Sequence, residues 1–197
     1  MQSPYLILAS QSPRRRELLA AAGYRFEVCP PSDEAESTNC GDETPTQLVA
    51  RLAMQKATDV AKRGGRGVVL GCDTVAECDG TVLGKPSDKA DARRMLETLS
   101  GREHRVLSGL CLLSLPNGKP MVRVAVTRLR MDRLSPEQLD GYLAGGQWSG
   151  KAGAFGYQDG IDWVHVLEGS ESNVVGLPLE LLAEMLATLP HTAHAAR

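Results

Sequence analysis

The chain opens with a short apolar strand that leads directly into a helix start carrying three arginines. The strand is expected over Tyr5–Ala9 and the helix over Pro13–Ala22. Ser12 suits the N-cap position, and proline is favoured at the first helical position. A strand followed at once by a helix is the beginning of a βα unit, so this end of the chain must pack a helix against a sheet.

The arginines at this helix start predict an anion site. Arg14 and Arg15 fall in the first turn, where the helix dipole favours acidic residues. The unpaired N–H groups of the turn, the hydroxyls of Ser10 and Ser12 and two guanidinium groups together suit a polyphosphate. A solvated basic turn is the alternative.

Strand and helix patterns alternate along the rest of the chain. We expect further helices at 47–62, 89–99, 136–144 and 179–189, and strands at 26–29, 68–72, 75–78, 81–83, 106–114, 121–131 and 163–167. Asp79-Gly80 is a strong hairpin turn signal, and the acidic stretch 30–46 is expected to be a long loop. The pattern predicts an α/β fold with a mixed, strongly twisted sheet and flanking helices.

Composition excludes several classes of protein. The chain has 197 residues, a net charge of −2 and five cysteines without a C-x-x-C pair, so neither a zinc site nor a disulfide framework is expected. It contains no apolar run near the roughly 20 residues that span a bilayer and no signal segment, which favours a cytoplasmic protein with no membrane partner. A charge near neutral argues against nucleic-acid binding.

Asp73 follows the apolar strand expected at 68–72. Ligand sites of α/β sheets lie at the carboxyl ends of strands, so this carboxylate is a candidate general base or metal ligand. Thr74 is a candidate hydrogen-bonding group for a substrate edge. The alternative is that Asp73 only caps the turn into the hairpin.

Two lysines are candidate partners of a bound anion. Lys56 falls inside the apolar stripe of its expected helix, where the small neighbours Ala53 and Ala57 leave room for an ammonium to enter a cleft. Lys85, between Gly84 and Pro86, is expected to return toward the same end of the sheet as Asp73. Snorkelling to solvent and an exposed loop are the respective alternatives.

The segment 151–160 combines glycines with Lys151 and Gln158. A glycine-rich backbone permits close approach to a ligand, and the Gln158 amide offers a donor and an acceptor to a base edge. Glu34 is a second acidic candidate, because carboxylates hold the Mg²⁺ that bridges phosphate oxygens. A flexible loop and a solvated charge are the alternatives.

One motif match is discounted. The run 77–82, Glu-Cys-Asp-Gly-Thr-Val, resembles the nucleophile motif of haloacid-dehalogenase-like phosphatases, but Glu77 stands where that chemistry needs the nucleophilic aspartate. The run is better explained as a hairpin turn. A P-loop and a nucleophile elbow are both missing from the sequence.

In this order the motifs resemble the Maf family of nucleoside triphosphate pyrophosphatases. The matching stretches are Leu-Ala-Ser-Gln-Ser-Pro-Arg-Arg at 8–15, Asp-Glu at 33–34, Arg-Leu-Ala at 51–53 with the lysine at 56, Gly-Cys-Asp-Thr-Val at 71–75, Gly-Lys-Pro at 84–86, Leu-Ser-Gly at 99–101, Lys-Ala-Gly-Ala-Phe-Gly at 151–156 and Val-Gly-Leu-Pro-Leu at 175–179. The resemblance implies one two-lobed domain over 1–189, related to inosine triphosphate pyrophosphatases, with the active site between the lobes. Residues 190–197 are expected to form a frayed tail.

The resemblance also implies a reaction. The family cleaves the α–β phosphoanhydride of a nucleoside triphosphate with a divalent cation, Mg²⁺ or Mn²⁺, and releases a monophosphate and pyrophosphate. Matched position by position, the implied roles are a proton acceptor at Asp73, base discrimination by Arg14, Thr74 and Gln158, phosphate binding by Ser10, Arg15, Lys56 and Lys85, and a metal-site acid at Glu34. Lys151 joins them as a substrate-binding candidate from its own motif.

Within the family the chain is most similar to the group acting on dTTP and UTP, with CTP and modified pyrimidine nucleotides left open. Family analogy implies a symmetric homodimer. Two other functions compete with this one. The first is a nucleotide-binding regulator of septum formation that needs no catalysis, and the second is a phosphatase that uses Asp79.

Overall fold

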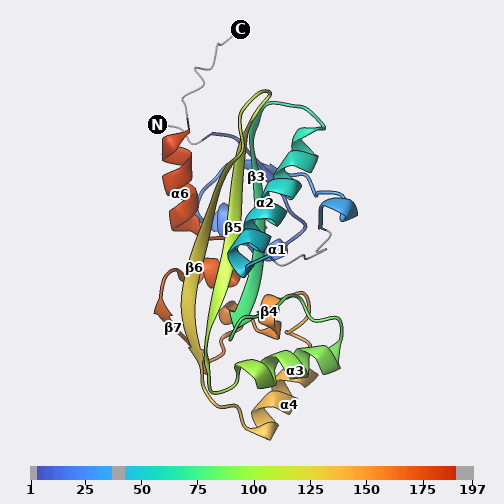
Figure 1. Ribbon diagram of the computed structural model, residues 1–197, viewed down its shortest axis with the longest axis vertical. Helices are drawn as coiled ribbons and strands as arrows, with labels where there is room; N and C mark the ends of the chain where they lie inside the picture. The colour runs from blue at the N-terminus through green and yellow to red at the C-terminus, as the bar shows by residue number, and fades with distance from the viewer. Residues whose placement is uncertain (1–3, 37–42, 190–197) are drawn as a thin grey trace.

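A seven-stranded mixed sheet forms the centre of the molecule (Figure 1). The computed structural model describes residues 4–36 and 43–189. The strands are β1 (Leu6–Ala9), β2 (Phe26–Val28), β3 (Gly67–Cys78), β4 (Thr81–Leu83), β5 (Glu103–Leu115), β6 (Met121–Met131) and β7 (Val164–Glu168). The predicted α/β class is confirmed; the predicted tail at 190–197 lies outside the described residues.

The helices flank this sheet. They are α1 (Pro13–Ala21), α2 (Pro45–Ala61), α3 (Lys89–Leu99), α4 (Pro136–Ala144), α5 (Glu171–Val175) and α6 (Leu179–Thr188), with 3₁₀ turns η1 (Asp33–Glu36), η2 (Ala152–Ala154) and η3 (Tyr157–Asp159). Capping boxes begin α2, at Thr44 and Gln47, and α4, at Ser135 and Gln138. The sequence did not predict α5 or the 3₁₀ turns, which are too short to show a helical period.

The sheet runs in the order β2-β1-β3-β5-β6-β7, and β4 also pairs with β3. Strands β1, β2 and β3 are parallel, whereas the pairs β3–β5, β5–β6 and β6–β7 are antiparallel. The long strands β3, β5 and β6 extend from the upper to the lower part of the molecule (Figure 1). They therefore connect the two parts through one continuous sheet.

One edge of β3 is shared by two short strands that do not meet. Strand β1 pairs with Val68–Gly71, and β4 pairs with Ala76–Cys78. Between them, residues 72–75 have no partner strand on this edge within the described chain. Asp73 was predicted to follow the end of a strand; instead β3 is continuous through it, and Asp73 lies mid-strand in this gap.

Helix α2 lies unusually close to the sheet. A Cβ atom added at Gly71 on β3 would lie 2.1 Å from the carbonyl oxygen of Ala53, and one added at Gly109 on β5 would lie 2.1 Å from that of Val49. Both contacts are with helix backbone, which no side-chain rotation relieves. Glycine at these two positions therefore sets the separation between α2 and the sheet.

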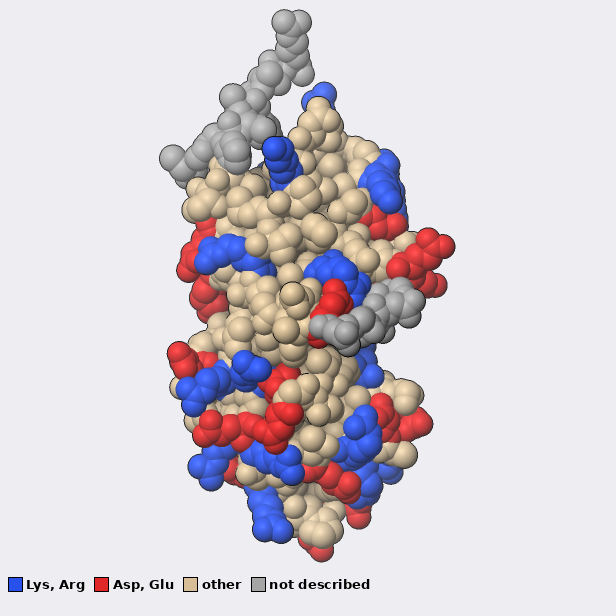
Figure 2. Space-filling view, viewed as in Figure 1, with Lys and Arg blue, Asp and Glu red and all other residues tan. Residues whose placement is uncertain are grey.

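The hydrophobic core divides along the sheet. In the upper part, β1, β3 and β5 pack α1 and α6 on one face, through side chains such as Leu19 and Leu182, and α2 on the other. In the lower part, α3, α4 and β7 enclose a separate cluster around Leu96 and Trp163. Figure 2 shows side chains of both charges interleaved over the lower half of the viewed face, whereas the upper half has a broader uncharged surface with charged side chains scattered around it. Among the helices described, none is long and apolar enough to cross a membrane.

His104 lies in the lower core with 3% of its surface exposed. Its ring packs edge-on against Phe155, with centroids 5.5 Å apart. Within the described chain neither ring nitrogen makes a well-formed hydrogen bond. Burial lowers the pKa of His104 from 6.5 to about 4, although the nearby Arg102 backbone and the charge of Glu77 oppose this shift. The folded protein therefore disfavours the imidazolium that the unfolded chain accepts.

This burial predicts acid sensitivity. Because the unfolded chain binds the proton near pH 6.5 and the folded chain only near pH 4, stability falls as the pH drops through that window. We expect urea titration to show a loss of about 2 kcal/mol between pH 7 and pH 5, a loss that His104→Leu largely removes. Equal losses in the two proteins would contradict this assignment.

Candidate active site

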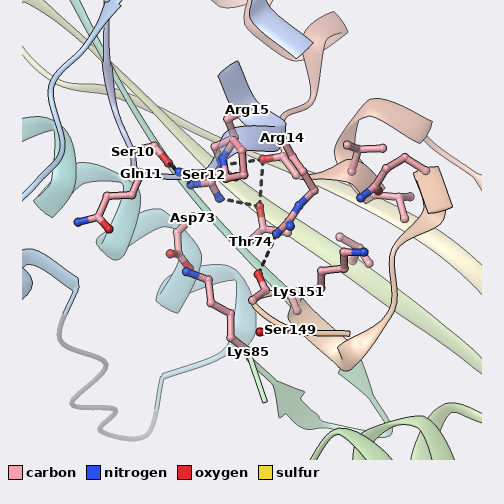
Figure 3. Close-up of a pocket in the computed structure, with 18 of the residues that line it drawn as sticks. Ser10, Gln11, Ser12, Arg14, Arg15, Asp73, Thr74, Lys85, Ser149 and Lys151 are labelled. Carbon is pink, nitrogen blue, oxygen red and sulfur yellow. Dashed lines mark hydrogen bonds between the residues drawn. The ribbon is translucent and has the colours of Figure 1, made fainter. Parts of the chain in front are cut away.

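A cavity of about 300 Å³ opens where residues 72–75 leave the edge of β3 uncovered (Figure 3). Its walls come from the β1–α1 junction, η1, α2, β3, the segment after β4, β5, the glycine-rich segment 149–158 and the end of α5. The predicted site residues that line it are Ser10, Arg14, Arg15, Lys56, Asp73, Thr74, Lys85, Lys151 and Gln158. Predicted residues from well-separated parts of the chain thus share one cavity.

Asp73 and Lys56 form the centre of this site. The Lys56 ammonium lies 2.8 Å from Oδ1 of Asp73 and 3.4 Å from Oε1 of Glu36. The Lys56 side chain is only 6% exposed, so the prediction that it enters a cleft from the apolar face of α2 is confirmed. Among the described residues none donates a hydrogen bond to Oδ2 of Asp73, and Asp73 lines the cavity.

The acidic residue on the opposite wall is Glu36. Glu34, the predicted metal-site acid, is exposed and is not among the residues that line the cavity. Both belong to the 3₁₀ turn η1, in which residues two apart point in different directions. Glu36 therefore occupies the position that was predicted for Glu34. This short acidic stretch has no periodic pattern from which the sequence could show which of the two glutamates faces the cavity.

Arg15 is largely occupied by the protein itself. Its guanidinium donates to Ser10 Oγ at 3.1 Å, to the Cys72 carbonyl at 2.8 Å, to Thr74 Oγ1 at 3.2 Å and to the Gly176 carbonyl at 2.9 Å. A guanidinium has five N–H groups, so at most one remains for a ligand. Arg15 thus ties β1, β3 and the end of α5 together, which differs from its predicted role as a phosphate ligand.

Arg14 and Lys85 approach the cavity from opposite sides. Arg14 donates from Nη2 to the Gly150 carbonyl at 2.8 Å, and burial followed by the charge of Arg15 lowers its pKa. Lys85 is exposed, and its side chain extends toward Asp73 (Figure 3). Desolvation is the main cause that lowers the pKa of Lys85, and the negative charge of Glu36 opposes this shift. The two side chains bring positive charge to both rims.

Lys151 is paired within its own segment. Its ammonium forms an ion pair with Asp159, and the two side chains are 10% and 15% exposed. Gln158, next to Asp159, is exposed and lines the cavity. Lys151 therefore lies in the cavity wall as predicted, but its charge is balanced by a carboxylate that the sequence did not single out.

The competing phosphatase motif lies elsewhere. Asp79 occupies the predicted hairpin turn, where Asp79 and Gly80 have φ of 48° and 81°, and it pairs with Arg102 at 3.0 Å. Glu77 is buried and bound to Arg105 at 2.7 Å. Neither residue lines the cavity, so the turn interpretation is confirmed.

The charge of the cavity suits a polyphosphate. Its lining residues include five cations and two carboxylates: Arg14, Arg15, Lys56, Lys85, Lys151, Glu36 and Asp73. Such a wall attracts a multiply charged anion and stabilises charge that develops on it. A carboxylate oxygen facing the same space can accept a proton from water.

Several proteins with similar sequences are named for the same activity. A dTTP/UTP pyrophosphatase from Rhodopirellula baltica is 54% identical over 189 residues, covering 95% of this chain and 83% of that protein. Another from Ruminiclostridium cellulolyticum is 40% identical and covers 93% and 95%; one from Caulobacter vibrioides is 42% identical and covers 94% and 96%. The protein described here is an enzyme of the nucleoside triphosphate pyrophosphatase class.

The family model described as Maf-like protein matches residues 5–189, and the chain belongs to the Maf family. The fold is also similar to that of a HAM1 protein from Coxiella burnetii, with a TM-score of 0.52 and 19% identity over 96% of this chain and 100% of that one. The predicted fold, a mixed sheet with flanking helices, is confirmed.

The role of Arg15 generates a prediction. Arg15→Lys keeps the positive charge but cannot reach four acceptors from one ammonium. Leaving buried carbonyls unsatisfied costs about 1–3 kcal/mol each, so we expect a lower melting temperature and reduced turnover together. If Arg15 served mainly as a phosphate ligand, the lysine variant would instead keep wild-type stability in thermal denaturation.

Proposed function

We propose that the protein hydrolyses dTTP and UTP at the α–β phosphoanhydride, giving the nucleoside monophosphate and pyrophosphate. The observation that carries this proposal is the Asp73 carboxylate, which lies between Lys56 and the cavity with one oxygen free. The names of the relatives support the choice of pyrimidine substrates. A polyanion bound along the cations would bring its phosphoanhydrides next to Asp73.

In the proposed reaction, Oδ2 of Asp73 accepts a proton from water. The water oxygen bonds to the α-phosphorus, and the bond from that phosphorus to the bridging oxygen breaks. Pyrophosphate leaves with the bonding electron pair. Lys56 holds Oδ1 and so fixes the orientation of the base, while Lys85 offsets negative charge on the phosphates.

Base selection is assigned chiefly to Gln158. Uracil and thymine present an edge of alternating acceptor, donor and acceptor, and a carboxamide offers both complementary groups. Thr74, the other candidate, already contacts Ser108 at 2.7 Å, Arg15 at 3.2 Å and the Gly176 carbonyl at 3.3 Å. Its hydroxyl therefore shapes the wall, whereas the exposed amide of Gln158 is better placed to contact a base.

We infer that a divalent cation accompanies the substrate, and the donor set fits one. The cavity offers the carboxylates of Asp73 and Glu36, and the described residues contain no cluster of three or more metal-ligating side chains. Mg²⁺ commonly binds through one or two carboxylates together with substrate phosphates. Bound there, it would neutralise phosphate charge.

The test is product analysis with Asp73→Asn. Loss of the base is expected to reduce kcat by about 10²- to 10⁴-fold while UTP still binds. Wild-type enzyme in ¹⁸O-water should place the label in UMP, as attack at the α-phosphorus requires. Asp79→Asn, in the hairpin turn, is the control and should retain wild-type turnover.

Release of UDP and orthophosphate would reject the proposed reaction. Full turnover by Asp73→Asn would reject the assigned base. A cellular effect on septum formation that survives loss of turnover in Asp73→Asn would favour the nucleotide-binding regulator instead.

A further inference from the structure

The Lys151–Asp159 ion pair closes a short loop over Gly156. A Cβ atom added at Gly156 would lie 2.2 Å from Oδ2 of Asp159 and 2.4 Å from Nζ of Lys151. The pair thus occupies the space that a side chain at this position would need. The N–H of Gly156 donates to the hydroxyl of Tyr142 at 3.1 Å, which also holds this backbone.

This pairing changes what Lys151 can do. Its ammonium is bound to Asp159, and both side chains are largely buried. Moving the ammonium to a phosphate would leave the Asp159 carboxylate partly buried without its cation, which is unfavourable. Lys151 is therefore better suited to hold its own segment in place than to bind the substrate.

The residue held by this arrangement is Gln158. It is exposed, lies in the 3₁₀ turn η3 and is flanked by two anchored neighbours. Asp159 is bound to Lys151, and the hydroxyl of Tyr157 donates to Glu171 at 3.0 Å. The first contact is largely buried and charged, whereas the second is exposed, so the ion pair contributes more to fixing the turn.

The rest of the segment is also tied to the cavity walls. The N–H of Gly153 donates to the Gly84 carbonyl at 3.0 Å, beside Lys85, and Arg14 donates to the Gly150 carbonyl. These contacts fix the beginning of the segment. The Lys151–Asp159 pair connects that fixed part to the turn that carries Gln158.

We propose that Lys151 and Asp159 are positioning residues for base specificity. They hold the Gln158 amide where it can contact the imide edge of a pyrimidine, and they act through Gln158 rather than on the phosphates. This inference rests on the proposed function, because it assigns Gln158 to the base. It predicts that disrupting the pair changes the choice of nucleotide more than the rate of the chemical step.

The test compares Lys151→Met, Asp159→Asn and Gln158→Ala, with exposed Asp162→Asn as the matched control. We expect the first two variants to raise KM for UTP about tenfold, a loss near 1.4 kcal/mol, with kcat changed by less than about threefold. The preference for UTP over GTP in kcat/KM should fall by a similar factor. Inhibition by pyrophosphate, which has no base, should stay unchanged.

A double-mutant cycle separates positioning from an independent effect. If the pair acts through Gln158, Gln158→Ala combined with Asp159→Asn loses no more base preference than Gln158→Ala alone. Additive losses would overturn the inference. So would weaker pyrophosphate inhibition in Lys151→Met but not in Asp159→Asn, because that pattern identifies Lys151 as a phosphate ligand.

Two further measurements keep the test decisive. If a single variant unfolds, Lys151→Met combined with Asp159→Leu leaves no unpaired charge and must show the same loss of base preference. Calorimetric binding of UTP and of pyrophosphate is measured beside turnover. A wild-type protein that binds UTP but releases no pyrophosphate would contradict the proposed function alone, whereas unchanged UTP binding in Asp159→Asn would contradict this inference.

Discussion

The backbone contact between α2 and the sheet is the constraint on which the site depends. Gly71 and Gly109 let the helix lie against β3 and β5 at a distance that any side chain would prevent. At that distance a lysine on the buried face of α2 reaches Asp73 on the same face of β3, and the 2.8 Å contact follows. The position of the carboxylate is therefore a consequence of packing in the upper core.

The second constraint is the interrupted edge of β3. Because β1 ends opposite Gly71 and the pairing with β4 covers only Ala76–Cys78, the backbone groups of β3 between these two stretches need other partners. Arg15 supplies one, by donating to the carbonyl of Cys72, and it joins the same stretch to the end of α5. The gap that exposes Asp73 to the cavity is thus stabilised by a residue that has at most one N–H group left for a ligand.

Local signals made most of the fold predictable. Alternating apolar patterns, capping residues and the Asp79-Gly80 turn located the long helices and strands within a few residues. The prediction of a break in β3 was wrong. Asp73 and Thr74 interrupt an apolar run in the sequence, but in the folded sheet the strand continues through them and both line the cavity. Two features of the site could not be predicted: Glu36 lines the cavity in place of Glu34, and Lys151 pairs with Asp159. Both depend on tertiary contacts in short irregular segments, where the sequence has no periodic pattern.

The most direct test of this account is the turnover of a Gly71→Ala variant. The added methyl group must push α2 away from β3, so we expect a folded but destabilised protein in which turnover falls at least about tenfold as Lys56 loses Asp73; overpacking of this kind costs about 1–3 kcal/mol or more. Gly141→Ala, in α4, meets no atom within 4 Å and should leave turnover unchanged. A Gly71→Ala protein with wild-type turnover would show that the close contact between α2 and the sheet does not position the site.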